Sequence, residues 1–310
     1  MDTPPLPPMS LAERVGSLAD ADDPWTTFDL HGAGARAAIE AALGEDWTWE
    51  GKAVLDFGAG IGRTLRHFVP ELEIADFHAC DIDVESVQWL QQNFPAVQSF
   101  TNEEMPPIDR PAETFDVIYA VSVFTHLLDS WAEWLLEMRR LLKPGGVLVA
   151  SFMTAADYDW LPGTPYDDER MGMFGWAAGQ PWDKGGPMVM HSPWWITEHW
   201  GRAMDVVRFV PSGEGDPWFI HGLAVLRHPG TPAPAVTDLA PPGDDPREAA
   251  ALSHNLDFVQ REAGRLRFDL EWLLDEKTRL EREAAARTTP GNDEASRPGG
   301  ALGVLRRLRR

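Results

Sequence analysis

The chain alternates continuous apolar runs with segments whose apolar residues recur every three or four positions. Apolar runs of about four to eight residues are typical of strands buried on both faces, whereas the wider spacing is typical of amphipathic helices. The pattern predicts helices at 33–43, 62–69, 84–94 and 130–142, and strands at 52–57, 75–83, 96–100, 114–124 and 147–152. This alternation predicts an α/β fold in which helices cover both faces of a parallel sheet.

Shifts in composition divide the chain into five segments. The first is rich in Pro and Asp and is expected to be poorly ordered, and a later Pro-rich stretch has the composition of a linker. The predicted segments are a disordered N-terminus at 1–23, the main α/β domain at 24–228 with an insertion at 154–200, a linker at 229–247, a long helix at 248–287 and a disordered basic tail at 288–310. Ligands of parallel sheets bind outside the carboxyl ends of the strands, so the main domain is where a site is expected.

A glycine-rich turn follows the first predicted strand. The stretch VLDFGAGIGR at 54–63 carries Gly58, Gly60 and Gly62, which allow a tight turn and a close approach of the backbone to a ligand. Its spacing differs from the G-x-G-x-x-G of dinucleotide-binding loops. The Arg-Thr that follows stands where a phosphate-binding P-loop has Lys-Ser/Thr. The turn therefore matches neither of these phosphate-binding motifs.

Two acidic side chains at strand ends indicate what this turn holds. Asp56 precedes the glycines, where it would repel a pyrophosphate and attract an ammonium group. Asp81 closes the second apolar run, where an acid can bind both hydroxyls of a ribose. Asp83 is expected to be the N-cap of the next helix, with Glu85 in its first turn. The pocket thus suits an amino acid and a ribose without a phosphate between them, a description that S-adenosylmethionine fits.

These motifs resemble those of class I S-adenosylmethionine-dependent methyltransferases. VLDFGAGIGR resembles the first motif of that family, ACDID its acidic second-strand end, TFDVIYAVSVFTHL its fourth strand, and LLEMRRLLKPGGVLVASF the next helix, turn and fifth strand. The resemblance extends from Gly51 to Phe152, and the segment 205–226 resembles the closing hairpin. It implies a Rossmann-like seven-stranded sheet whose last strand is antiparallel. No Asn-Pro-Pro-Tyr type motif follows the fourth strand, which argues against nucleobase methylation.

The resemblance also implies contacts with the cofactor. Asp56 and the backbone of the glycine turn would bind the methionine end, and Asp81 would bind the ribose. Ile82 would lie beside the adenine. The amino group of the adenine would bind either Asn102 or Glu103, and the sequence does not choose between these two residues. The segment VSVFTH would form the floor where methyl transfer occurs. The residues expected around S-adenosylmethionine are Asp56, Gly58, Ala59, Gly60, Gly62, Asp81, Ile82, Asn102, Glu103 and Ser122.

Methyl transfer is an in-line displacement that depends mainly on alignment, but a hydroxyl acceptor also needs a base for its proton. His126, just past the fourth predicted strand, is the leading candidate, and the alternative is that it caps or packs at a helix start. Asp157, His191 and His221 are further candidates, of which His221 is expected to be structural within a strand. The histidines show neither H-x-x-E-H nor H-E-x-x-H, so the sequence does not support a metal site.

The insertion at 154–200 is dense in Trp, Met, Gly and Asp and should lie over the carboxyl ends of the strands, where an acceptor arrives. A tryptophan face can stack on a sugar while a carboxylate binds its hydroxyls, which suggests a glycan or another polyhydroxylated acceptor. The alternative is that the tryptophans form the small core of a loop-rich lid. Within the insertion, Ser192 is expected to cap a helix that has Pro193 in its first turn. Before the first helix, the segment 22–35 is expected to cover the cofactor with Trp25, Phe28 and Gly32.

The segment 248–287 carries a heptad seam. Its positions follow one another at alternating spacings of four and three: Leu252, Leu256, Val259, Ala263, Leu266, Leu270, Leu273, Lys277, Leu280 and Ala284. This predicts a coiled coil and a homo-oligomer through residues 250–285, and the alternative is a helix that folds back on its own domain. The basic tail GVLRRLRR suggests a weak contact with an anionic membrane surface or an acidic partner, or else a disordered end.

The composition narrows the function further. A formal net charge of −22 argues against nucleic acid as a partner, because phosphate binding needs clustered Lys and Arg. The single cysteine, Cys80, excludes an internal disulfide, and the N-terminus lacks a secretory signal, so the expected location is cytoplasmic. The sequence favours an enzyme that transfers a methyl group to a small-molecule or carbohydrate acceptor, at oxygen. The alternative is a non-catalytic scaffold of the same fold that acts through its coiled coil.

Overall fold

A computed structural model describes residues 4–15, 18, 22–153, 167, 169–177, 179–213, 216 and 218–288. The chain divides into two compact units, Met1–Asn255 and Leu256–Arg310. The first unit contains the sheets and the candidate site. The described part of the second unit is a stretch of one long helix.

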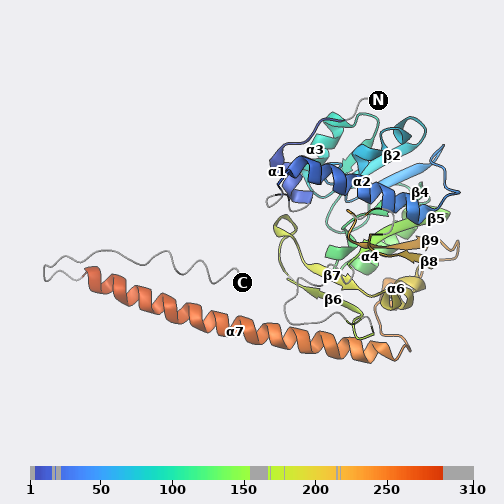
Figure 1. The fold of residues 1–310 in the computed structure, drawn as a ribbon. Coiled ribbons are helices and arrows are strands. Elements are labelled where there is room, and N and C mark those ends of the chain that lie inside the picture. The colour runs from blue at the N-terminus through green and yellow to red at the C-terminus, as the bar shows by residue number, and fades with distance from the viewer. Residues whose placement is uncertain are drawn as a thin grey trace. The chain divides into compact units, whose positions relative to one another are not determined.

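The main sheet has seven strands in the order β3-β2-β1-β4-β5-β9-β8 (Figure 1). Its strands are β1 Ala53–Phe57, β2 Asp76–Asp81, β3 Gln98–Thr101, β4 Phe115–Ala120, β5 Leu142–Phe152, β8 Asp205–Val210 and β9 Gly222–Arg227. Strand β9, the last along the chain, runs antiparallel to both β5 and β8, and the other pairs are parallel. This confirms the expected sheet. The strand order reverses between β1 and β4, so the ligand-binding switch point lies at the carboxyl ends of these strands.

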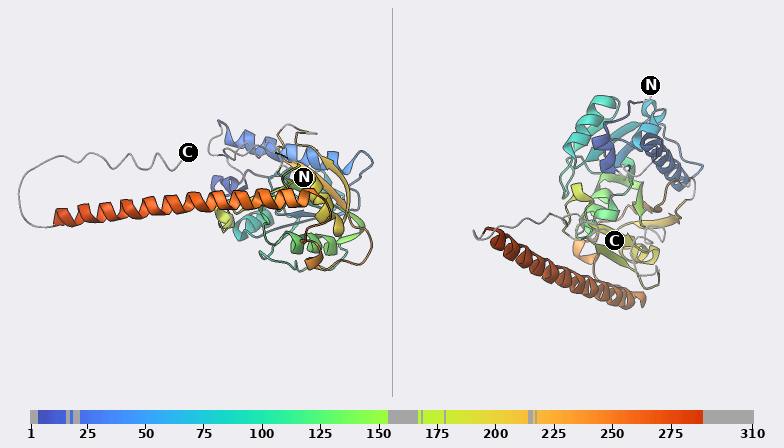
Figure 2. Two further views of the ribbon diagram at one scale, coloured as in Figure 1. Left: turned by 90° about the horizontal axis from the view of Figure 1, so that it is seen from below. Right: turned by 60° about the vertical axis from the view of Figure 1, so that its left-hand side comes forward.

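Helices cover both faces of this sheet. The α-helices are α1 Met9–Ala12, α2 Pro24–Leu43, α3 Val84–Asn93, α4 Trp131–Leu141, α6 Pro193–His199 and α7 Arg247–Thr288. The 3-10 turns are η1 Glu13–Val15, η2 Leu65–Phe68, η3 Glu71–Glu73, η4 Phe124–His126, η5 Trp182–Lys184, η6 Trp200–Arg202 and η7 Val236–Asp238. Helices α2 and α3 contribute to one apolar core and α4 and α6 to the other. In Figure 2, α2 and α4 lie on opposite sides of the strands.

Alternation along the strands explains the two cores. On β1, Val54 packs with the residues of α2, whereas Leu55 packs with those of α4. On β4, Val117 and Ile118 divide in the same way. Because successive side chains point to opposite faces, an uninterrupted apolar run fills both cores at once. This is why the central strands read as continuous apolar stretches in the sequence.

The first long helix begins earlier than the apolar spacing predicts. Helix α2 starts at Pro24, whereas the spacing predicted a helix over 33–43. Asp23 is its N-cap and accepts a hydrogen bond from the backbone N–H of Thr26 at 3.2 Å. Pro24 at the first helical position needs no backbone N–H, which suits that position. The segment expected to cover the cofactor is therefore mostly the first turns of this helix.

Phe28 and Gly32 of α2 have packing roles in this arrangement. Phe28 is buried in a small cluster with Ile61, against the glycine turn. A Cβ at Gly32 would lie 2.2 Å from the backbone oxygen of Arg63, so only glycine allows α2 to approach this closely. Neither residue lines the cavity described below, and neither does Trp25.

The segment 62–69, predicted to be a helix, contains only turns and the 3-10 turn η2. Gly62 has φ +80°, so a regular helix cannot include it and could begin only after it. Pro70 directly follows the segment. Too few residues remain between these two positions for a stable α-helix, because closing its first turn is costly and only the residues that follow recover that cost.

The Pro-rich segment 229–247 packs partly against α6, within the first unit. Leu239 is fully buried, and its backbone oxygen lies 2.7 Å from Nδ1 of His199 on α6. Nε2 of the same histidine lies 2.8 Å from Oε1 of Glu248, in the first turn of α7. The spacing of apolar residues gave no sign of this packing, because a single buried leucine forms no periodic pattern.

Helix α7 continues into the second unit from Leu256 onwards. Its seam is exposed there, with Leu256 and Leu266 each retaining 58% of their accessible surface. Polar residues outside the seam form ion pairs along the helix, as Arg265 does with Glu262 and Asp269. The basic tail from residue 289 lies outside the described residues. Among the residues that the structure describes, no helix is long and apolar enough to span a membrane.

The burial of Leu239 generates a test of the core. Leu239→Ala should destabilise the protein by about 2–5 kcal/mol, because it removes buried methyl groups and leaves a cavity. Urea unfolding would measure this loss, with Val207→Ala as the control, since Val207 is 44% exposed. Equal losses for the two variants would show that Leu239 does not belong to the core.

Candidate functional site

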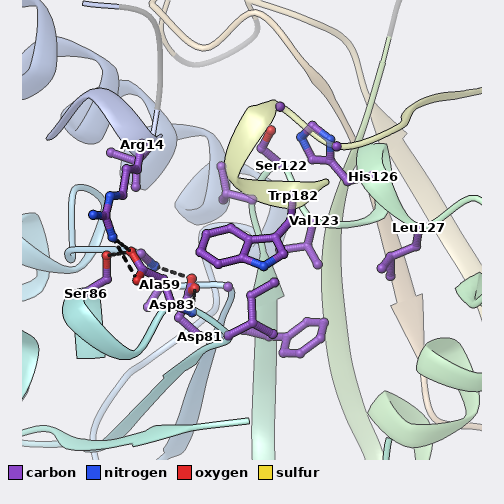
Figure 3. Close-up of a pocket in the computed structure, with 18 of the residues that line it drawn as sticks. Arg14, Ala59, Asp81, Asp83, Ser86, Ser122, Val123, His126, Leu127 and Trp182 are labelled. Atoms are coloured by element: carbon purple, nitrogen blue, oxygen red, sulfur yellow. Dashed lines mark hydrogen bonds and ion pairs between the residues drawn. The ribbon is translucent and has the colours of Figure 1, made fainter. Parts of the chain in front are cut away.

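A cavity of about 1140 Å³ opens where the carboxyl ends of β1, β2 and β4 meet (Figure 3). The glycine turn, the residues after β3 and the residues after β4 line it, and the connection between β6 Met173–Trp176 and β7 Met188–His191 closes one side. This volume exceeds the roughly 300–1,000 Å³ typical of small-molecule sites. The cavity is therefore large enough for a nucleoside-sized ligand and a second small molecule.

Most of the residues predicted for the site meet in this cavity. Those that line it are Asp56, Gly58, Ala59, Gly60, Asp81, Ile82, Asn102, Ser122 and His126. Two do not line it. Glu103 is exposed outside the cavity, and Gly62 packs against α3, where a Cβ would lie 2.8 Å from Cδ2 of Leu90.

The glycine turn is held open by its backbone conformation. Gly58 and Gly60 have φ of +78° and +53°, a region that other residues rarely adopt. A Cβ at Gly58 would lie 2.3 Å from Cγ2 of Val123, and one at Gly60 would lie 2.3 Å from Cγ1 of Val15. The turn thus presents bare backbone to the cavity, with apolar side chains close on two sides.

The acid at the end of β2 fastens this turn. Oδ2 of Asp81 accepts a hydrogen bond from the Gly60 N–H at 2.7 Å, and Oδ1 accepts one from the Asp83 N–H at 2.8 Å. Burial raises the pKa of Asp81, and the backbone donors oppose that rise. Each oxygen keeps a further lone pair, so the carboxylate can still accept hydrogen bonds from a ligand. Asp83 is the N-cap of α3, as expected, and accepts from the Glu85 N–H at 3.2 Å.

The acid at the end of β1 is in a more apolar setting. Asp56 is 3% exposed, and the Tyr119 hydroxyl donates to its Oδ2 at 3.0 Å. Burial raises the pKa of Asp56 to about 8, the Tyr119 hydrogen bond lowers it, and the nearby charge of Asp81 raises it. Burial thus favours the protonated carboxyl over the ionised one. A ligand ammonium group would favour the ionised form.

The residues after β3 contain an unsatisfied acceptor. Nδ2 of Asn102 donates to the backbone oxygen of Glu103 at 2.9 Å, and the Asn102 N–H donates to the backbone oxygen of Asp81 at 3.1 Å. Oδ1 of Asn102 is buried and has no hydrogen-bond partner among the described residues. A buried acceptor without a donor is costly, so a ligand donor at this position would be favoured.

The residues after β4 place a histidine at the cavity. Ser122 has φ +59°, and its N–H donates to the Ser151 hydroxyl at 2.6 Å, which turns the chain into η4. His126 ends that 3-10 turn, and its Nδ1 lies 2.8 Å from the backbone oxygen of Pro187. A carbonyl only accepts, so Nδ1 carries the hydrogen and Nε2 the lone pair. Burial lowers the pKa of His126, which keeps the imidazole neutral.

The other catalytic candidates lie elsewhere. His191, on β7, is buried against Trp195 and Trp200, and burial lowers its pKa to about 3. Asp157 lies outside the described residues. His221 precedes β9 and is not inside a strand as the sequence had suggested. His221 does not line the cavity.

The described tryptophans of the insertion differ in burial. Trp194, Trp195 and Trp200 are buried with the α4 core, which agrees with the small-core interpretation. Trp176 is partly exposed on β6 but does not line the cavity, and Trp160 lies outside the described residues.

Trp182 is 43% exposed, and its ring lies in the cavity between Asp81 and Val123 (Figure 3). Among the described tryptophans of the insertion, Trp182 is therefore the one that offers a stacking surface to the cavity.

Ser192 does not cap α6 through its side chain. Pro193 occupies the first helical position, as expected, but the Ser192 hydroxyl donates to the backbone oxygen of Met171 instead. The Ser-Pro sequence therefore marks the start of the helix correctly but gives the wrong partner for the hydroxyl.

Sequence reasoning missed an N-terminal strap over the cavity, formed by residues 9–15. Arg14 lines the cavity and binds Asp83 at 2.8 Å, and it also pairs with Glu85. Val15 contacts Gly60 from the same side. The segment has only seven residues, which is too short for a periodic apolar pattern, and it follows a proline-rich start that suggested a poorly ordered end.

The raised pKa of Asp56 predicts how stability depends on pH. Its ordinary pKa of 3.8 rises to about 8 on folding, so the folded protein binds one more proton between these values. Stability should therefore fall as the pH rises from about 4 to about 8, by up to about 1.4 kcal/mol per pH unit. Asp56→Asn should flatten this dependence in thermal melts recorded across that range.

Asp46→Asn is the matched control for this measurement, because Asp46 is exposed. Its melting temperatures should follow those of the unsubstituted protein at every pH. Parallel curves for Asp56→Asn and the unsubstituted protein would show that Asp56 ionises normally.

Comparison with known proteins agrees with this geometry. Residues 55–148 match a family model described as a methyltransferase domain. The chain is 25% identical to the tRNA U34 carboxymethyltransferase of Hydrogenovibrio crunogenus over 47% of this chain and 48% of that protein. It is 33% identical to the malonyl-[acyl-carrier protein] O-methyltransferase of Halalkalibacterium halodurans over 33% of this chain and 39% of that protein. It is 28% identical to the sterol 24-C-methyltransferase of Debaryomyces hansenii over 39% of this chain and 31% of that protein.

The chain spans less than half the length of each of these relatives. The matched segment runs from β1 into β5 and includes the glycine turn and the acidic ends of β1 and β2. With the strand order of the sheet, this match identifies residues 55–148 as a methyltransferase domain within a Rossmann-like fold.

Proposed function

We propose that this protein transfers a methyl group from S-adenosylmethionine to an oxygen of a small-molecule or carbohydrate acceptor. One observation carries the proposal: the glycine turn with its two acids shares a single cavity with a neutral histidine whose Nδ1 is held by a carbonyl. The first group suits the cofactor, and the second suits removal of a proton from an acceptor hydroxyl.

The charged and polar groups fit the methionine and ribose parts of the cofactor. Asp56 would bind the ammonium group. The nearby charge of Asp81 destabilises the ionised form of Asp56, and the positive charge of the ammonium group would offset this repulsion. The bare backbone of Gly58 and Gly60 would lie against the methionine chain. Asp81 would accept hydrogen bonds from the ribose hydroxyls with the lone pairs that its backbone donors leave. When bound, S-adenosylmethionine supplies a methyl group activated by a sulfonium.

The unsatisfied acceptor of Asn102 fits the adenine part. Its Oδ1 would accept a hydrogen bond from the exocyclic amino group, which ends the cost of a buried, unpaired oxygen. Glu103 is less suited to this role, because it is exposed outside the cavity. Ile82, beside Asp81, would provide apolar contact with the ring. Of the two residues that the sequence offered, Asn102 is therefore the one we propose.

His126 would act as the general base. Its Nε2 would accept the hydroxyl proton while the carbonyl of Pro187 holds the ring in one orientation through Nδ1. A neutral imidazole is needed for this, and the lowered pKa keeps His126 in that form at neutral pH. The charge that develops on the ring is partly compensated by the carbonyl dipole, as in other histidine bases.

The acceptor class rests on the shape and surface of the remaining cavity. Trp182 presents an aromatic ring there, which suits stacking on a sugar or another flat face. The three relatives above are named for a tRNA, malonyl-[acyl-carrier protein] and a sterol, so their names do not agree on an acceptor. The net charge of −22 opposes nucleic acid. A small molecule or glycan is the acceptor that we propose.

The exposed seam of α7 supports a homo-oligomer through residues 250–285. Alternating spacings of four and three place its leucines on one stripe, and about half of the surface of each remains accessible, from 48% for Leu273 to 58% for Leu266. An apolar stripe of this length favours pairing with a second helix. We propose a parallel or antiparallel coiled coil with a second copy, in which Lys277 fixes the register.

Isothermal titration calorimetry and a methyl-transfer assay would test the enzymatic proposal. The protein should bind S-adenosylmethionine, and with the methyl-deuterated cofactor it should label hydroxylated compounds in a cell extract, read by mass spectrometry. His126→Gln should leave cofactor affinity unchanged and lower the transfer rate about 10²–10⁴-fold. His228→Gln is the control, because that histidine lies outside the cavity lining. A folded protein that binds no cofactor would exclude the proposed activity.

Light scattering of the full chain would test the oligomer. Leu266→Glu combined with Leu273→Glu should reduce the mass to that of one chain, because both charges would be buried in the seam. Phe268→Glu should leave the mass unchanged, since Phe268 lies off the seam and is 69% exposed. A monomeric mass for the unsubstituted chain would rule the coiled coil out.

A further inference from the structure

The connection between β6 and β7 places a tryptophan ring inside the cavity. Residues 180–182 and 184–187 of this connection line the cavity, and the 3-10 turn η5 within it begins at Trp182. The ring of Trp182 lies between Asp81 and Val123, and the residue is 43% exposed (Figure 3). The ring therefore projects into the open cavity and not into an apolar core.

The glycine turn joins the two residues that flank this ring. Oδ2 of Asp81 accepts a hydrogen bond from the Gly60 N–H at 2.7 Å. At the other end of the turn, a Cβ at Gly58 would lie 2.3 Å from Cγ2 of Val123. Because Asp81 and Val123 both lie against the turn, the ring between them lies over the turn itself (Figure 3).

The proposed function needs the same space for the cofactor. The backbone of Gly58 and Gly60 would lie against the methionine chain, and Asp81 would bind the ribose. The sulfonium joins these two parts of S-adenosylmethionine, so the molecule must extend along the turn towards Asp81. Two groups cannot fill one volume, so the indole of Trp182 and the bound cofactor exclude each other.

Little holds the ring in this position. Among the described residues, the indole of Trp182 makes no hydrogen bond, ion pair or aromatic contact. Trp195 of α6, by contrast, stacks on His199 with ring centroids 4.1 Å apart. Displacing the ring of Trp182 therefore costs mainly the apolar contacts of a partly exposed side chain.

Glycines on both sides of η5 allow the ring to move without the rest of the connection. Gly179 has φ +82°, and Gly185 and Gly186 have φ of +97° and +57°. Glycine changes its backbone angles more easily than any other residue. Gly185 and Gly186 also separate the ring from Pro187, whose backbone oxygen lies 2.8 Å from Nδ1 of His126. Rotation at these two glycines would move η5 while the carbonyl stays bonded to the histidine.

We propose that Trp182 is a gate of the cofactor site, which S-adenosylmethionine enters only when η5 carries the ring away from the glycine turn. This inference rests on the proposed function, because it concerns access to that same site. Only the open form binds, so the observed affinity is reduced in proportion to the fraction of molecules that are open. The displaced ring is then free to stack on the acceptor, so the cofactor binds first.

Calorimetry of the full chain with S-adenosylhomocysteine would test the gate. Trp182→Ala should bind this ligand about tenfold more tightly than the unsubstituted protein does, which corresponds to an open form that holds about a tenth of the molecules. Trp218→Ala is the matched control, because Trp218 is also 43% exposed but does not line the cavity. The affinity of the control should equal that of the unsubstituted protein. Weaker binding by Trp182→Ala would overturn the gate, because it would show that the ring contacts the ligand.

Stopped-flow mixing with the same ligand would show at which step the ring acts. The association rate constant should rise about tenfold in Trp182→Ala, because every encounter then finds the site open, and the dissociation rate constant should stay the same. Trp134 lines the cavity in both proteins, so intrinsic fluorescence can report binding. A tighter complex that results only from slower dissociation would overturn the gate. Equal binding by both proteins would exclude the gate alone, whereas failure of both to bind would exclude the proposed activity together with the gate.

Discussion

The glycine turn depends on three hydrogen bonds from its N–H groups to the end of β2. The N–H groups of Gly58 and Ala59 donate to the backbone oxygen of Cys80 at 2.9 and 3.0 Å, and that of Gly60 donates to Oδ2 of Asp81 at 2.7 Å. These bonds hold the positive φ angles of the turn and fix the acid of β2 beside it. The site is therefore a property of the β1–β2 pair, and the elements that close the cavity are arranged around that pair.

Two acids lie together at the glycine-turn side of the cavity. Burial raises the pKa of both Asp56 and Asp81, although the Tyr119 hydroxyl and the Gly60 N–H donate to them. Burial destabilises the charged form of each carboxyl, so each gains when a ligand of opposite charge is bound. The cavity is therefore suited to a ligand that carries a positive charge at this position.

The sequence predicted the sheet and much of the cavity lining because both follow from local patterns. Continuous apolar runs mark the central strands, and the acids that end β1 and β2 stand directly after such runs. The contacts that the sequence did not reveal are made across the fold. Tyr119 meets Asp56 because β1 and β4 are adjacent and in register, and no spacing in the chain encodes that pairing. Arg14 reaches Asp83 from 69 residues away.

Two local predictions failed for physical reasons. The apolar spacing after Gly62 resembles a helix, but the positive φ of that glycine and the proline at position 70 leave too short a segment. The start of α2 was placed too late because its first turns carry polar residues that contribute little to an apolar pattern, whereas Asp23 and Pro24 are helix-start signals in their own right.

The ion pairs of Arg14 make the attachment of the strap sensitive to salt. Arg14 is partly exposed, and so is its partner Glu85, with 37% and 65% of their side-chain surfaces accessible. Exposed ion pairs weaken as dissolved salt screens them. The contact between the strap and α3 is therefore expected to weaken as the ionic strength rises. Asp83 thus stabilises α3 as its N-cap and also binds the strap through Arg14.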